Sequence, residues 1–200
     1  MITIKSYSLW VCVLIGLISL AGTCKKRVVK RIDPNEIRDI SGRWNDTDSR
    51  LIAQRIVLDV INGNWIYRHE KENKDKKPVV IIGMIRNKTH EHIDTETFMK
   101  AIEASFVKTG MIHLVEGGKK RDELRAERAD QQIYAASSTV KKWGLEKGAD
   151  YILQGSIHSI IDHHKKNKIS YYRVALQLTH LQNNEVVWMK DEEIKKHIKN

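Results

Sequence analysis

The sequence predicts a mixed α/β (α+β) fold with a single mixed sheet, about three flanking helices and a C-terminal antiparallel meander. Three observations predict it. Apolar residues recur at helical spacing in the first two thirds of the chain. The run at residues 79–85 is apolar on both faces, as in a central strand. From Ile169 onward apolar and polar residues alternate, as in strands with one solvated face.

The first helix is expected to begin at Asn45 or Asp46, either of which can cap its free N–H groups. Its buried face consists of two adjacent apolar rows, Ile52/Ile56/Val60 and Ala53/Val57/Ile61. Gly63 is expected to end it. We expect residues 68–77 to form a charged loop.

Two further helices follow. Asp94 or Thr95 caps the second, which ends at Gly110 and buries one row, Phe98, Ile102 and Phe106. The third is expected over residues 121–143, with a stripe of Ile133, Ala136, Val140 and Trp143, and Gly144 stops it.

The strands are expected at 79–85, 112–116, 151–161, 169–179 and 186–189. Pro78 introduces the first strand. The polar turn at residues 163–168 and the Asn183-Asn184 pair separate the last three, which gives a meander with one wet face.

The N-terminal segment is predicted to be an export signal. Lys5 supplies a positive start, and the apolar stretch at 9–18 is shorter than the roughly 20 residues of a spanning helix. We therefore assign residues 1–23 to a signal peptide. Cys12 leaves with it, so the mature chain keeps Cys24 alone and has no intramolecular disulfide.

Cys24 is the predicted lipidation site. Leu20-Ala21-Gly22-Thr23 before it resembles the lipobox of bacterial lipoproteins, although the leucine stands four residues before the cysteine and Thr23 replaces a smaller residue. Two or three acyl chains would anchor the chain stably. Cleavage after Ala21, which leaves Cys24 as a free thiol, is the alternative. Residues 24–40 form a short linker, and 41–200 the globular domain.

The composition allows one domain and gives the chain a positive charge. Of 200 residues, 41% are hydrophobic and 30% are charged. The chain has 35 Lys and Arg and 25 Asp and Glu, which gives a net charge of +10. This balance favours anionic partners such as lipid, glycan, nucleic acid or an acidic protein, and a lysine-rich genome background explains it equally well.

Three segments together resemble the LpoB family, lipoprotein activators of bifunctional penicillin-binding proteins. They are residues 41–48 (SGRWNDTD), 85–95 (IRNKTHEHIDT) and 148–157 (GADYILQGSI). The resemblance runs from about residue 40 to 196. The third segment is also similar to the TolB N-terminal domain and to the curli-secretion lipoprotein CsgG. The resemblance implies a TolB-like four-stranded sheet with flanking helices and extra C-terminal strands.

The resemblance also implies a function. We expect an exported, lipid-anchored protein of the outer membrane, facing the periplasm, that binds a bifunctional penicillin-binding protein and activates peptidoglycan synthesis. No enzymatic activity, cofactor or nucleic-acid partner is expected. The family's best-known member has a long linker, whereas here about 16 residues span roughly 55 Å when extended. The alternative is a TolB- or CsgG-like role in envelope transport or assembly.

The first two motifs supply the residues expected at the partner surface: Arg43, Trp44, Arg86, His90 and His92. Trp and Arg are favoured at binding hot spots, while Trp44 could instead staple the helix entry. His90 and His92 could alternatively hold a metal with Glu91 or Asp94, although we expect a structural loop there. No nucleophile elbow or phosphate loop is present.

Two basic stretches are expected to be ordinary solvated surface. Acidic residues interleave the basic ones along 119–128, and no aromatic residue lies beside them for nucleic-acid stacking. His163 and His164 are expected at a solvated turn.

Overall fold

The computed structural model describes residues 27–199, so the expected signal peptide and Cys24 lie outside the described residues. Contacts divide the chain into two compact units, Met1–Glu36 and Ile37–Asn200. All the helices and strands of the described range belong to the second unit, which is called the domain below. None of these helices has the length and hydropathy that a membrane span requires.

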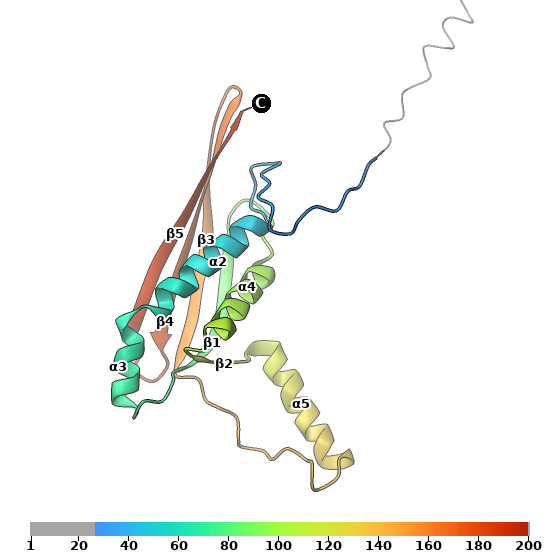
Figure 1. Cartoon of the computed structure of the whole chain (residues 1–200), viewed down its shortest axis with the longest axis vertical. Coiled ribbons are helices and arrows are strands. Elements are labelled where there is room, and N and C mark those ends of the chain that lie inside the picture. Colours follow the sequence, from blue (N-terminus) through green and yellow to red (C-terminus); the bar gives the residue numbers. More distant parts are fainter. Residues whose placement is uncertain (1–26, 200) are drawn as a thin grey trace, which may run out of the picture. The chain divides into compact units, whose positions relative to one another are not determined.

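The domain is built on one five-stranded mixed sheet in the order β2-β1-β3-β4-β5 (Figure 1). β1 (Val79–Lys88) pairs in parallel with β2 (His113–Val115) and with β3 (Tyr151–His164). β4 (Asn167–His180) and β5 (Val186–Lys199) continue the sheet by antiparallel pairing. The predicted mixed α/β class and C-terminal meander are therefore confirmed. The resemblance implied a four-stranded sheet with extra C-terminal strands, and the sheet has five strands.

Helices α2 (Asp46–Ile61) and α4 (Thr95–Thr109) pack on each other and on one face of the sheet (Figure 1). The predicted rows meet there. Phe98, Ile102 and Phe106 of α4 are fully buried, and so are the first row of α2 and the inward row of β4, Tyr172, Val174, Leu176 and Leu178. Asp94 caps α4, and Gly110 ends it with a φ of 62°, a left-handed conformation that glycine adopts without strain.

The segment after α2 differs from the expectation of a charged loop. Asn62, not Gly63, caps the C-terminus of α2, and Gly63 starts a further helix, α3 (Asn64–Glu72). Its inner side is buried: Trp65 donates a hydrogen bond to the Val60 carbonyl at 2.8 Å, and His69 Nδ1 lies 3.0 Å from the Tyr151 hydroxyl. Burial lowers the pKa of His69. The helix forms because three buried side chains fix it, although its other residues are charged.

The third expected helix is shorter and differently placed. α5 runs over Gly118–Tyr134, has no buried residue, and gives way to extended backbone at Ala135. The predicted stripe is therefore wrong: Ile133 and Trp143 are 72% and 53% exposed. Ser137, Ser138 and the β-branched Thr139 disfavour helix here.

A carboxylate helps to bind the segment that follows α5 back to that helix. Glu146 accepts hydrogen bonds from Arg125, at 3.0 Å, and from Arg128. The two guanidinium groups lower the pKa of Glu146 to about 2.

The last three strands are longer than expected. Each has 14 residues, the turn between β3 and β4 is reduced to Lys165 and Lys166, and β5 continues to Lys199 instead of ending at 189. β5 continues because every second residue of its charged end still faces inward: Ile194 packs on the core, Lys196 is 9% exposed, and Ile198 follows in the same row.

The other face of the sheet is largely uncovered. Met84 of β1 and Met189 of β5, for example, are 63% and 72% exposed. The pairing of β1 with β3 shifts between Ile82 and Ile85, which marks a β-bulge. Beside it lies a shallow depression of about 280 Å³, lined by Met84, Arg86, Lys88, Gln154, Gly155, Ser156 and Gln177.

Candidate partner-binding site

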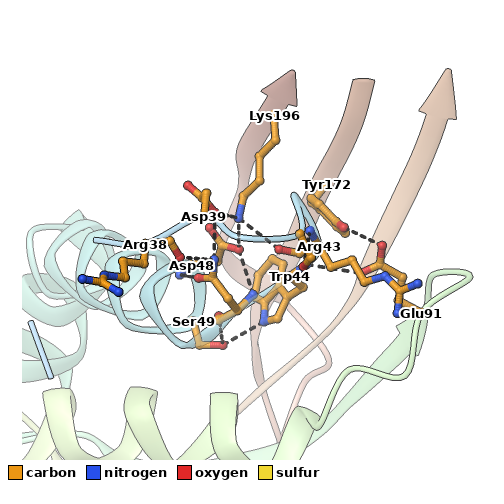
Figure 2. Close-up of polar contacts among 11 residues, drawn as sticks. Arg38, Asp39, Arg43, Trp44, Asp48, Ser49, Glu91, Tyr172 and Lys196 are labelled. Atoms are coloured by element: carbon orange, nitrogen blue, oxygen red, sulfur yellow. Dashed lines mark hydrogen bonds and ion pairs between the residues drawn. The ribbon is translucent and has the colours of Figure 1, made fainter. Parts of the chain in front are cut away.

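The first two sequence motifs meet at one end of the domain, although the residues that join them, Trp44 and Glu91, are 47 residues apart in the chain. Their link is the carboxylate of Glu91 (Figure 2). It accepts a hydrogen bond from the backbone N–H of Trp44 at 3.2 Å and another from the Tyr172 hydroxyl at 2.8 Å. One side chain therefore ties the entry of α2, the loop after β1 and the strand β4 together.

Trp44 is held from several sides. Its ring makes edge contacts with Phe98, at a centroid distance of 5.9 Å, and with Tyr172 at 5.6 Å. Its indole N–H donates to Ser49 Oγ at 2.8 Å, so the residue before the cap contacts the fourth residue of the helix, as in a staple. The half-buried Trp44 thus makes the contacts expected of a residue that staples the entry of α2. Its role in binding a partner stays a prediction.

Asn45, one of the two caps that the sequence indicated, forms a reciprocal cap at the N-terminus of α2. The Asn45 side chain accepts from the Asp48 N–H at 3.1 Å, and the Asp48 carboxylate accepts from the Asn45 N–H at 2.9 Å. The turn that presents Arg43 is fixed by this cap.

A buried lysine connects the same turn to β5. The Lys196 ammonium donates to Asp48 at 2.7 Å, to the Arg43 carbonyl at 3.1 Å, and to Asp39 (Figure 2). The Lys196 side chain is 9% exposed and that of Asp48 8%, whereas that of Asp39 is 48% exposed. Burial therefore raises the pKa of Asp48 despite the lysine, while the Lys196 hydrogen bond lowers the pKa of Asp39.

The loop after β1 is braced by its own polar side chains. The Asn87 amide donates to the Glu91 carbonyl at 2.8 Å, and the Thr89 hydroxyl donates to the same carbonyl at 3.0 Å. Asp94, which caps α4, follows directly, and hydrogen bonds from Thr97 lower its pKa. His90 and His92, which precede and follow Glu91 in sequence, therefore lie on a fixed backbone.

The predicted partner residues divide into two groups. Arg43, His90 and His92 are exposed, and the Glu91 contact brings the segments that carry them together. Arg86 is exposed too, but it faces the depression on the open face of the sheet. Within residues 27–199 no three His, Cys, Asp or Glu residues are grouped as a metal site would need.

Sequence reasoning missed the residues that hold this surface together: Glu91, Tyr172 and Lys196 had no assigned role in it. Tyr172 belongs to the alternating stretch that begins at Ile169, which predicted a strand and no contact for its hydroxyl. The burial of Lys196 could have been predicted, because Lys196 alternates with Ile194 and Ile198 in a strand whose even-numbered residues face inward.

Comparison with known proteins gives one family. Residues 48–194 match the family described as peptidoglycan-synthase activator LpoB. No curated protein sequence matches the chain.

Among solved structures, the LpoB C-terminal domain from Escherichia coli is 14% identical, with a TM-score of 0.47, and that from Salmonella enterica is 15% identical, with 0.44; each match covers 74% of this chain and 99% of the other. Lipoprotein GNA1162 from Neisseria meningitidis is 10% identical over 60% of this chain and 83% of that one, with a TM-score of 0.39.

Proposed function

Since this chain belongs to the LpoB family of peptidoglycan-synthase activators, we propose that it binds a bifunctional penicillin-binding protein and raises its peptidoglycan output. It acts by contact as a regulator and carries out no reaction itself. The observation that supports a binding role most directly is the Glu91 network, which joins the two most specific motifs and holds exposed polar side chains on a fixed frame.

The exposed residues around this network have the chemistry of a recognition surface. Arg43 beside the network and Arg86, at the depression on the open face of the sheet, present guanidinium groups, which make paired hydrogen bonds to carboxylates. His90 and His92 lie on the braced loop that follows Arg86 in sequence. Because the backbone beneath is already ordered by caps and side-chain hydrogen bonds, little conformational freedom remains to be lost on binding. The partner surface is expected to be acidic.

The proposal places the chain in the cell envelope, with a lipid on Cys24 as its anchor. Asp39 and the Arg43 carbonyl are bound by Lys196, so the chain is held on the domain at Asp39. About 14 residues remain between Cys24 and that point, and they span roughly 48 Å when extended. Asp39, where the chain joins the domain, therefore lies within that distance of the membrane that carries the lipid.

Reversing two charges of the surface tests the proposal. We expect the pair Arg43→Glu and Arg86→Glu to weaken binding to a purified bifunctional penicillin-binding protein at least about tenfold, because like charges would face an acidic partner. Affinity is measured by isothermal titration calorimetry, with both variants checked for folding by circular dichroism.

The matched control is Lys71→Glu with Lys76→Glu, which changes the net charge equally at exposed positions around the end of α3. Its affinity is expected to stay within about twofold of the parent. An equal loss in both pairs would show a net-charge effect without a defined surface. If the parent chain does not bind the penicillin-binding protein at tens of micromolar, the proposal is wrong. The alternative role in envelope transport or assembly would then be favoured.

A further inference from the structure

The ends of the last three strands form a strongly basic surface, which we call the hairpin end: residues 162–168 and 195–199. The strand register brings these segments together, since Asn167 pairs with Lys199 and Tyr171 with Lys195. Beyond the buried Lys196, the hairpin end carries one carboxylate, Asp162, and five lysines: Lys165, Lys166, Lys168, Lys195 and Lys199. In Figure 1 these strands extend past helices α2 and α4.

The ammonium groups of these five lysines make no contact that holds the domain together. Within residues 27–199 none of these side chains has a hydrogen bond or ion pair, and four of the residues are exposed, with Lys168 half-buried. Two other lysines of β5 are paired with carboxylates: Lys190 with Asp59, and the buried Lys196 with Asp48. A set of unpaired like charges on adjacent strands repels itself and attracts anions.

Exposed apolar side chains lie directly beside the lysines. Ile160 and Ile161, on opposite faces of β3, are 66% and 39% exposed, and Ile160 is in register with Tyr171 and Lys195. Ile40, next to the bound Asp39, is 91% exposed. Lysines mixed with aliphatic side chains suit a lipid headgroup region, where the charge meets phosphate and the aliphatic groups enter the acyl boundary.

The chain enters the domain at this same end. Lys196, within the hairpin end, binds Asp39 and the Arg43 carbonyl. Gly42, at a φ of 65°, lies so close to Ile198 that a Cβ on it would come within 2.3 Å of the Ile198 side chain. The covalent connection toward Cys24 therefore starts beside the five lysines.

We propose that the hairpin end binds anionic phospholipid headgroups of a membrane surface. Acyl chains and a basic patch are the two signals whose combination gives stable membrane attachment, and here both would act on the same end of the domain. The patch would hold the domain on the membrane with a defined side facing it. This inference does not depend on the identity of the synthase.

Vesicle sedimentation tests it. The full chain carrying Cys24→Ala, so that no acyl chain contributes, is mixed with vesicles of phosphatidylcholine alone or with 30 mol% phosphatidylglycerol. We expect binding about tenfold stronger to the anionic vesicles and falling with salt. Lys165→Glu with Lys166→Glu is expected to abolish this preference. Lys141→Glu with Lys142→Glu, an equal charge change on the exposed segment after α5, should alter it less than about twofold.

Three results would overturn the proposal. They are equal binding to both kinds of vesicle, an equal loss in both double variants, and tighter binding to a soluble anionic polysaccharide or nucleic acid than to the vesicles. Circular dichroism of each variant confirms that it is folded, and the comparison of the two double variants on the same vesicles cancels any contribution from the apolar and basic N-terminal segment, which is common to all samples.

Discussion

Replacing Lys196 with Met is expected to destabilise the domain by about 3–5 kcal/mol. The change leaves the Asp48 carboxylate, whose residue is only 5% exposed, without its cation in a site where burial already raises the pKa of that carboxyl. It also releases Asp39 and the Arg43 carbonyl, so the turn that presents Arg43 loses its link to β5. The free energy of unfolding is measured by equilibrium urea denaturation.

The control for Lys196 lies three residues further along the same strand. Lys199→Met removes an exposed lysine that has no partner within the described residues, and its effect is expected to stay within about 0.5 kcal/mol. Adding Asp48→Asn to the Lys196→Met variant removes the uncompensated charge, and we expect it to recover part of the loss. A loss below about 1 kcal/mol for Lys196→Met would show that the buried ion pair does not support the turn.

Replacing Glu91 with Ala is expected to cost about 2–4 kcal/mol, because two donors lose their acceptor at once. The Trp44 N–H and the Tyr172 hydroxyl both donate to this carboxylate, and burial together with Glu91 raises the pKa of Tyr172, which stays a donor. His90→Ala, one residue earlier and exposed, is the control and should change the free energy of unfolding by less than about 0.5 kcal/mol.

A double-mutant cycle shows whether the two motifs are joined through this contact. We expect Glu91→Ala and Tyr172→Phe to be coupled by at least about 1 kcal/mol, because each removes the partner of the other. Additive effects would mean that Glu91 stabilises the loop alone and does not connect it to β4.

Local patterns predicted the elements that carry their own signals. α4 has a capping Asp94, a single apolar row and a terminal Gly110, and it was predicted with these residues. α3 was missed because only Trp65, Ile66 and His69 of its nine residues are buried, so its charged side chains dominate the pattern. The extent of α5 was wrong because the apolar spacing after Tyr134 is not used for packing.

The site was harder to predict than the fold. The motifs indicated which segments matter, yet the contact that joins them spans 47 residues from Trp44 to Glu91 and 81 from Glu91 to Tyr172. No spacing rule connects positions so far apart, because their proximity depends on where α2 and the loop lie over the sheet. Lys196 is bonded across a still longer separation, 148 residues, to Asp48.

The most direct measurement of the proposed function is the rate at which a bifunctional penicillin-binding protein polymerises its lipid-linked disaccharide precursor, with and without the purified chain. We expect the rate to rise several-fold at saturating chain, to fall back with Arg43→Glu and Arg86→Glu, and to remain raised with Lys71→Glu and Lys76→Glu. A rate that the parent chain leaves unchanged while it binds the synthase, or one that all variants raise equally, would contradict activation through this surface.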